Sequence, residues 1–518
     1  MKLKKVLGCI LSIGLLLNPI SVYADETNVV ATSADGSQSY TSIEDAWNAA
    51  KQNTSISLTN DWATNDRLIV EKGQTVTIDL NGHSITRQLS DSVDDGEVIY
   101  MNEKSTLTIN GSTNRTFSVS DYELGSKVGY ASVTTGGVIT GGMSSNGAGG
   151  IHMKANTTLT LNHVGIVGNY ADGHYFSHAG GVQLDGKQCT LNMNNGSMIS
   201  YNAGYYGGGV LITDEDGVIN MSASEISNNY SSEDGGGIYS CKDATYITLD
   251  NHSKISNNRA KNGGGVYFKS SYAHINSNDN TGKISNNVVR GDSSHTTPSG
   301  GGIYFHMAVF SDDIATLKNV TLENNTASQD YESKGGAVYT TLANIEITNC
   351  TFKNNKAKQG GAIYILEDGI TFKDCTITNN SASDQGGAIF VNSVYDINVS
   401  GKMVVKDNTK GNGSTSNIYL ENGTFTRAYV SGTPDSGSEV GLTGDGDCKV
   451  GIKQTSDNGS FFVDNPNSYH LQYDDGKLYQ RNGATSSIFG NGNVGIACVV
   501  IVGIAVIGFV VYKKKKVE

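Results

Sequence analysis

Proline is almost missing from this chain, with 4 residues among 518, whereas 64 residues are glycine. Abundant glycine without proline excludes a collagen helix and a proline-rich linker. Charged residues make up only 17% of the chain and give a formal net charge of −13. Because nucleic-acid binding requires lysine and arginine to neutralise phosphates, we expect no nucleic-acid partner. The hydrophobic share of 37% is also low for a chain with one large conventional core.

Apolar runs long enough to act as targeting signals stand at the two ends of the chain. Three lysines precede an apolar run over residues 6–17, and Val22-Tyr23-Ala24 fits a cleavage site, so residues 1–24 are predicted to be a secretory signal peptide. Residues 494–512 carry no charge and would span about 28 Å as a helix, which predicts one transmembrane helix. Four lysines follow directly, so the basic tail 513–518 is expected in the cytoplasm and the large preceding segment outside the cell membrane.

The segment between these ends is strongly acidic. Without the seven lysines and the one glutamate of the two ends, 30 basic residues oppose 49 acidic residues, a formal charge of −19. Such a surface is soluble and repels anionic polymers unless cations bridge the two.

A repeat runs through the middle of the chain. A triplet of small residues is followed by Ile or Val and often by Tyr, as in GGGIY, GGGVY and GGAIY. The aliphatic residues of the nine copies are Ile151, Val182, Val210, Ile238, Val266, Ile303, Val338, Ile363 and Ile389. Their separations are 25 to 37 residues, which is the range expected for a solenoid.

A second signal has the same period as the first. In every copy an apolar residue stands three positions before an asparagine. These marker asparagines are Asn169, Asn202, Asn229, Asn258, Asn287, Asn325, Asn355, Asn380 and Asn408. Between the two signals lies a run with period-two alternation, such as Leu159-Thr160-Leu161. Each copy therefore predicts about three short strands and no helix.

Short strands of this kind bury their inward residues only by stacking on the next copy, so the fold class is predicted to be an all-β parallel β-helix, or β-solenoid. Right-handedness is expected from the general bias of parallel crossovers. Asparagine tolerates left-handed backbone, and its amide can bond to the copies above and below, so we expect the marker asparagines at a corner.

These residues carry a family resemblance. The paired GGA(I/V) and FxxN signatures, clearest at Phe352-Lys353-Asn354-Asn355 and Gly360-Gly361-Ala362-Ile363, resemble the repeats of polymorphic outer membrane protein-type surface proteins. More broadly they are similar to right-handed parallel β-helix proteins of the pectate-lyase-like class. The resemblance covers roughly residues 76–419. The chain departs from that family at its C-terminus, where the predicted transmembrane helix and basic tail favour a cell with a single membrane, such as a Gram-positive bacterium.

The ends of the repeat array are expected to be capped, because an exposed terminal coil invites edge pairing. We assign residues 25–74 to an N-terminal cap that contains a helix near 42–50, with Ile43, Ala46, Trp47 and Ala50 on its apolar face. The repeats then occupy 75–420, and a β-rich C-terminal cap occupies 421–481. Residues 482–493 are predicted to be a flexible linker to the membrane helix.

The candidate ligand-binding residues are aromatic. They directly follow the repeat aliphatic residue, so alternation points them outward, one above another at about 4.8 Å. They are Tyr239, Tyr267, Tyr304, Tyr339, Tyr364 and Phe390. One interpretation is a row of open rings, flanked by glycine and alanine, that stacks on sugar rings or on a protein partner. The other is that these rings only pack on their neighbours or under a loop.

The sequence offers no catalytic cluster. Acidic residues recur after the aromatic positions, at Asp185, Asp214-Glu215-Asp216, Asp243, Asp312-Asp313 and Glu367-Asp368. Most of them adjoin glycine and are interpreted as solvated turns, with occasional Ca²⁺ binding between them. We therefore predict no catalytic residues, no cofactor and no dedicated metal site.

The histidines and cysteines are interpreted as structural. His174 and His178 are four residues apart, but a shared metal face at that spacing needs a helix, so we expect a loop role. Cys350 and Cys375 stand one repeat apart at equivalent inward positions, within disulfide range. We expect stacked core thiols there instead of a disulfide.

The function that follows is a membrane-anchored extracellular β-helix protein, adhesin-like, that binds a glycan or a cell-surface protein without catalysis. The alternative is a surface polysaccharide lyase or glycoside hydrolase of the pectate-lyase-like fold. A third reading, a passive spacer in the envelope, predicts no ligand.

Overall fold

A computed structural model describes residues 29–482, apart from 124–125, 173–177, 270–271, 293, 307–313, 342–343, 367–368, 394–396, 422–429, 433, 444–451, 454–459 and 475–476. The predicted signal peptide, the transmembrane helix, the basic tail and most of the predicted linker lie outside the described residues. Within the described residues, no helix is both long enough and apolar enough to cross a membrane.

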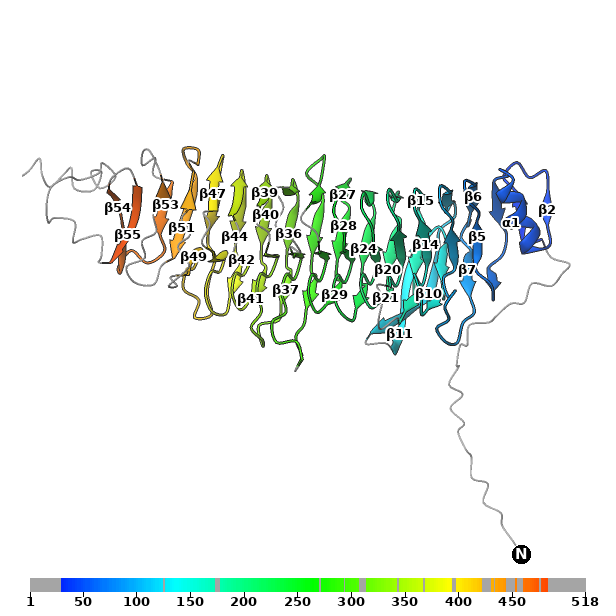
Figure 1. Ribbon diagram of the computed structural model, residues 1–518, viewed down its shortest axis with the longest axis horizontal. Helices are drawn as coiled ribbons and strands as arrows, with labels where there is room; N and C mark the ends of the chain where they lie inside the picture. The colour runs from blue at the N-terminus through cyan, green and yellow to red at the C-terminus, as the bar shows by residue number, and fades with distance from the viewer. Residues whose placement is uncertain are drawn as a thin grey trace, which may run out of the picture.

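The described chain forms a long rod of stacked coils, with its N-terminal helix at one end and β54 and β55 near the other (Figure 1). One coil is typical of the rest: β26 (Ile238–Ser240), β27 (Thr245–Asp250), β28 (Lys254–Ser256) and β29 (Arg259–Ala260). Each of these strands pairs in parallel with its counterpart one coil later, for example Tyr239 with Tyr267 and Ile255 with Ile284. The predicted parallel β-solenoid is confirmed.

The coils contain four kinds of strand, which we name by position. The aromatic strands follow the small triplet or stand at the equivalent position: β5 (Leu68–Val70), β8 (Ile99–Met101), β14 (Ile151–Lys154), β18 (Val182–Asp185), β22 (Val210–Ile212), β26, β30 (Val266–Phe268), β34 (Ile303–Phe305), β38 (Val338–Thr340), β42 (Ile363–Leu366), β46 (Ile389–Asn392) and β49 (Ile418–Leu420). The long strands come next: β3 (Ile56–Leu58), β6 (Thr75–Asp79), β9 (Thr106–Asn110), β15 (Thr158–Asn162), β19 (Thr190–Asn194), β23 (Val218–Ser222), β27, β31 (Ala273–Asn276), β35 (Ala315–Lys318), β39 (Asn344–Thr348), β43 (Gly369–Lys373), β47 (Ile397–Ser400), β50 (Val430–Ser431) and β52 (Ile452–Lys453).

The marker strands precede the marker asparagines or stand at the equivalent position: β4 (Trp62–Thr64), β7 (Ser84–Arg87), β12 (Val138–Thr140), β16 (Gly165–Val167), β20 (Met198–Ser200), β24 (Glu225–Ser227), β28, β32 (Lys283–Ser285), β36 (Thr321–Glu323), β40 (Thr351–Lys353), β44 (Thr376–Thr378), β48 (Val404–Lys406), β51 (Glu439–Thr443) and β53 (Phe461–Val463). The short strands complete the coil: β13 (Met143–Ser144), β17 (Tyr170–Ala171), β21 (Ala203–Gly204), β25 (Tyr230–Ser231), β29, β33 (Val288–Val289), β37 (Thr326–Ala327), β41 (Lys356–Ala357) and β45 (Ser381–Ala382). The sequence predicted three strands per coil and missed this fourth one, because two residues are too few to show an alternating pattern.

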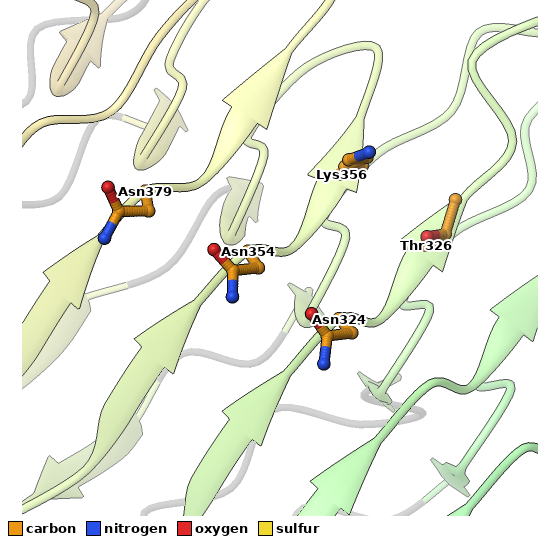
Figure 2. Close-up of a pocket in the computed structure, with 5 residues that line it drawn as sticks. All are labelled: Asn324, Thr326, Asn354, Lys356 and Asn379. Carbon is orange, nitrogen blue, oxygen red and sulfur yellow. The ribbon is translucent and has the colours of Figure 1, made fainter.

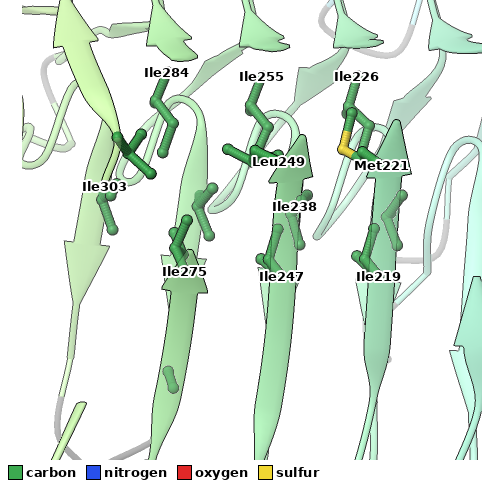
Figure 3. Close-up of a cluster of buried hydrophobic side chains, with 14 of the residues drawn as sticks. Ile219, Met221, Ile226, Ile238, Ile247, Leu249, Ile255, Ile275, Ile284 and Ile303 are labelled. Atoms are coloured by element: carbon green, nitrogen blue, oxygen red, sulfur yellow. The ribbon is translucent and has the colours of Figure 1, made fainter. Parts of the chain in front are cut away.

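One hydrophobic core fills the rod along its length, from Ala31 to Phe461. Inward residues of three strand types meet in each coil, and like residues stack on like, as Figure 3 shows for Ile219, Ile247 and Ile275 of the long strands. Cys350 and Cys375 are buried in the same core as free thiols, so the prediction of stacked thiols instead of a disulfide is confirmed.

The marker asparagines form a buried ladder. Each Nδ2 donates a hydrogen bond to the Oδ1 of the next asparagine, at 2.8–3.1 Å, from Asn169 through Asn408 to Asn417. The predicted bonding between copies is thus confirmed. The expected left-handed backbone belongs instead to the residue before the marker, as at Asn354 with φ 57°.

The two ends of the solenoid differ. Near the N-terminus, β1 (Ala31–Ser33) and β2 (Ser39–Tyr40) precede α1 (Ile43–Lys51), whose Trp47 is buried in the core and donates from Nε1 to the carbonyl of Ile69 at 3.1 Å. The predicted helix is confirmed, while its role as a cap stays a prediction. At the other end, marker strands continue in parallel to β53, and β54 (Tyr469–Asp474) pairs antiparallel with β55 (Lys477–Asn482).

A hairpin that the sequence did not predict leaves the solenoid wall. Strands β10 (Arg115–Glu123) and β11 (Ser126–Thr135) pair antiparallel with each other. Their apolar residues Phe117, Val119 and Val133 form a separate cluster with Val138 and Val167 of two marker strands. The hairpin therefore covers the outside of marker strands β12 and β16 (Figure 1).

Candidate binding faces

The predicted aromatic residues lie together in one column. The column runs through the centres of successive aromatic strands, from Tyr239 to Phe390, and extends to Tyr419. Neighbouring ring centroids are 4.6–5.5 Å apart. The rings form clusters separate from the main core, on the opposite side of the sheet from the inward aliphatic residues, so alternation predicted their direction correctly.

The expectation of open ring faces is wrong. Tyr239, Tyr267, Tyr339, Tyr364 and Phe390 expose only 2–6% of their surface. Their faces are covered by one another: Tyr364 and Phe390 stack with an interplanar angle of 4°. Stacking between coils stabilises the rod and leaves little ring surface for a sugar. Their part in ligand binding stays a prediction, and Tyr304 is the most accessible of the six.

A row of polar residues lies beside the aromatic column, at the position before the left-handed glycine of each triplet. It includes Asp234, Asn262, Ser299 and Lys334, which are paired in parallel from coil to coil. The Lys334 ammonium lies 4.9 Å from the centre of the Tyr364 ring, a cation–π contact. The edge of the buried column is therefore polar and half-buried.

Asp234 in this row gives a pH-dependent prediction. Burial raises the pKa of Asp234 to about 6, although Asn262 donates a hydrogen bond to its Oδ1 at 3.0 Å. The folded state then takes up a proton before the unfolded state does, so stability rises as pH falls from about 7 to about 4. We expect Asp234→Asn to raise the free energy of unfolding by about 1 kcal/mol at pH 7.5, after solvent screening is allowed for, and to leave it nearly unchanged at about pH 3, where the carboxyl is protonated in both states. Guanidinium unfolding of both proteins at the two pH values measures this, and an equal difference at both would contradict it.

A polar cluster that the sequence did not reveal lies at the N-terminal head of the same column. His152 and Gln183 continue the column beyond Leu211, and Tyr100 lies edge-on to His152 at 5.2 Å. Asp185 accepts from His152 Nε2 at 2.9 Å and from Lys154 Nζ at 2.5 Å. Burial would raise the pKa of Asp185, but these two hydrogen bonds hold it well below its usual range.

This cluster corrects one interpretation of the sequence. Asp185 is an ion-paired residue and not a solvated turn residue. Acidic residues also stand beside arginine, since Arg67 binds Asp95 at 2.7 Å and the buried Glu97 at 2.6 Å. No sequence pattern indicated this, because the partners are 28 and 30 residues apart. Each carboxylate named here is paired with a basic side chain.

The acidic and histidine positions that remain differ in their surroundings. Glu215 pairs with Lys187 on the surface, and His178 is buried and accepts from the Gly147 amide at 3.0 Å. Asp312, Asp313, Glu367, Asp368 and His174 lie outside the described residues. Among the residues that are described, no group of three or more His, Cys, Asp or Glu side chains is placed to hold a metal ion. Calcium at the acidic turns stays a prediction.

An exposed repetitive face lies on the marker-strand side. The residue before each marker is a left-handed asparagine in six successive coils, and from Asn257 onward it is exposed: Asn257, Asn286, Asn324, Asn354 and Asn379. We call these five the amide column. Asn324, Asn354 and Asn379 project side by side and line a shallow hollow of about 330 Å³ with Thr326 and Lys356 (Figure 2).

The amide column differs from the buried ladder next to it in its hydrogen bonding. In the described part of the chain, none of its five side-chain amides has a hydrogen-bond partner within the protein. Each amide offers one acceptor and two donors to solvent or to a ligand. Sequence reasoning noted these asparagines only as part of the FxxN signature, since the pattern does not say which of two adjacent asparagines is buried.

Comparison with known families finds a match to four segments of the repeat region. Residues 223–241, 319–341, 349–366 and 374–392 match the model of the Chlamydia polymorphic membrane protein repeat. Each matched segment contains a marker asparagine of the buried ladder and the small triplet of the next turn. A search of curated proteins gave no match. The chain is therefore a parallel β-helix protein that contains repeats similar to those of Chlamydia polymorphic membrane proteins.

Proposed function

We propose that this protein is an adhesin-like surface protein that binds a glycan or a cell-surface protein through the side of its rod, without catalysis. The observation that supports this most is the amide column, whose unpartnered amides repeat at the coil spacing over about 19 Å at roughly 4.8 Å per coil. Because the same weak contact repeats along the rod, an extended ligand can make several such contacts at once and bind more tightly than through any single contact.

The rest of the chain fits display outside a cell. We propose that residues 1–24 direct secretion, that residues 494–512 anchor the protein in the cell membrane, and that the α1 region caps the first coil. The rod then holds its sides away from the membrane, where a ligand can reach them.

The proposal predicts that loss of the amides abolishes binding. Cells that display the full chain would be tested for adhesion to glycan and protein panels. Replacement of Asn324, Asn354 and Asn379 by glycine, which accepts the left-handed backbone, is expected to reduce adhesion at least tenfold. The matched control replaces exposed left-handed asparagines elsewhere on the rod by glycine, at Asn156, Asn195 and Asn251. Equal adhesion by the two variants would refute a binding role for this face.

The polar cluster at His152 and Asp185 is the observation that supports the alternative, a polysaccharide lyase or glycoside hydrolase. The same panels can be scored for release of reducing ends or unsaturated sugars by the displayed protein. Release that His152→Ala abolishes would establish the enzyme and replace the binding proposal.

A further inference from the structure

The hairpin β10–β11 and the amide column share one face of the rod. In the first coils the position of the column holds Gly168 and Tyr201 instead of asparagine. A Cβ at Gly168 would lie 3.0 Å from the backbone of Ser120, so the hairpin leaves little room there. Tyr201 packs against the apolar cluster of the hairpin.

The hairpin ends where the amide column begins. Near its tip, Tyr122 stacks on Tyr170 at 5.2 Å, and Glu123 accepts from Arg259 Nη1 at 3.1 and 3.2 Å. Arg259 lies in the same coil as Asn257, the first exposed residue of the column. Val167, Met198 and Tyr201 belong to or pack against the apolar cluster of the hairpin, whereas Asn257 and the later asparagines of the amide column are exposed. The face is therefore closed by protein on one side of the tip and open on the other.

The open part of the face suits a linear ligand that runs along the rod. Its five amides are in register, one per coil, and the short-strand row beside them presents Thr326 and Lys356. An extended β-1,4-linked glycan advances by a distance close to the coil spacing with each sugar. Such a chain would present a hydroxyl-bearing ring to each amide in turn.

The charges on this face favour acidic sugars. Lys283 and Lys353 both bind Glu323, at 3.0 and 2.9 Å, so one carboxylate is shared by two cations. Burial would raise the pKa of Glu323, but the two lysines lower it, so this carboxylate stays ionised at neutral pH. Lys356 is exposed and, among the described residues, has no acidic partner. The open face thus carries an excess of positive charge on an otherwise acidic protein.

We propose that the amide column binds a linear glycan that carries carboxylates, lying along the rod axis on the open side of the hairpin tip. This rests on the proposed function and adds the ligand class and its direction. The amides form hydrogen bonds with the sugar hydroxyls. The carboxylates of the glycan face Lys356 and the group of Lys283, Glu323 and Lys353, in which two lysines share one glutamate and one positive charge remains. The surrounding acidic surface confines such a polymer to this strip by repulsion.

The test uses the full chain in detergent micelles with oligomers of a uronic acid in a ladder of defined lengths. Carboxyl-reduced oligomers of the same lengths provide the neutral comparison. We expect affinity to rise with length and to level off near five sugars, and we expect reduction of the carboxyls to weaken binding at least tenfold. Lys356→Gln should weaken binding of the acidic oligomers about tenfold and leave that of the neutral ones unchanged. The control is Lys373→Gln, an exposed lysine of the long strand β43.

The outcomes of these experiments distinguish failure of the acidic-glycan proposal from failure of the proposed adhesin function. Equal binding of acidic and reduced oligomers, or an equal effect of the two lysine variants, would overturn the acidic-glycan proposal. If the acidic-glycan proposal fails but cell adhesion still depends on Asn324, Asn354 and Asn379, the proposed function stands. Affinity that levels off at one or two sugars would overturn the axial direction, because a ligand across the rod meets only one coil.

Discussion

Replacement of the buried Asn355 by leucine is expected to lower the free energy of unfolding by about 2–6 kcal/mol. Asn355 Oδ1 accepts from both the backbone N–H and the Nδ2 of Asn325, at 2.9 and 3.1 Å. Both donors lie inside the rod, where no water replaces the lost acceptor, and each unsatisfied buried group costs roughly 1–3 kcal/mol. Asn380 Oδ1 and the Leu322 carbonyl also lose a donor each.

The adjacent Asn354 supplies a matched control. It is exposed, lies in the left-handed region and has no internal side-chain partner, so Asn354→Asp should change the free energy of unfolding by less than about 0.5 kcal/mol. Because a solenoid unfolds by coils and not necessarily in one step, guanidinium midpoints should be combined with hydrogen exchange. Faster exchange centred on the coils of Asn325 and Asn380 is expected. Similar effects of the two substitutions would mean that the ladder does not stabilise the stack.

The parts of the fold that the sequence predicts are those in which each coil repeats its neighbour. Asn355 and Asn380 are 25 residues apart in the chain and hydrogen-bonded in the structure, because stacking places equivalent positions in contact. The same register put Cys350 over Cys375 and Tyr239 over Tyr267. Repetition in the sequence is therefore direct evidence of contact, and it predicted the core, the ladder and the ring column.

The parts that the sequence did not predict depend on contacts that do not repeat. Alternation correctly directed Tyr364 to the outer side of its sheet, but it could not show that Phe390 and Lys334 would cover the ring. The hairpin over 115–135 occurs once, so no period marks it, and its ion pair from Glu123 to Arg259 joins residues 136 positions apart. The pairing of Asp185 with His152 likewise occurs once, between the successive strands β18 and β14. Candidate binding faces are therefore harder to predict than the solenoid that carries them.

The repeat triplet itself is explained by the space available to its three residues. The first glycine of each typical copy, such as Gly300 with φ 68°, needs left-handed backbone. The second, Gly301, has no room, since a Cβ there would lie 2.4 Å from the Gly336 carbonyl oxygen and 2.7 Å from the Thr326 carbonyl carbon. The third tolerates alanine, as Ala337 and Ala362 show in later copies. The pattern GGG or GGA is thus a steric requirement of closely stacked turns.

Gly301→Ala is accordingly expected to lower the free energy of unfolding by about 3 kcal/mol or more, at the upper end of overpacking effects. The clash is with backbone atoms of two neighbouring segments, so the coils must separate locally. This separation would lengthen two hydrogen bonds between coils: from the Gly301 amide to the Gly335 carbonyl, now 3.1 Å, and from the Gly302 amide to the Gly336 carbonyl, now 3.2 Å. The control is Gly302→Ala, one residue later. A Cβ there would lie 2.7 Å from one backbone atom, the Ala337 carbonyl oxygen, and alanine occupies this position in other copies, so the substitution should cost less than Gly301→Ala. Guanidinium midpoints of the two variants measure the difference. If Gly302→Ala were the more damaging substitution, the steric order of the triplet would be wrong, and close stacking of the turns would not be what selects its glycines.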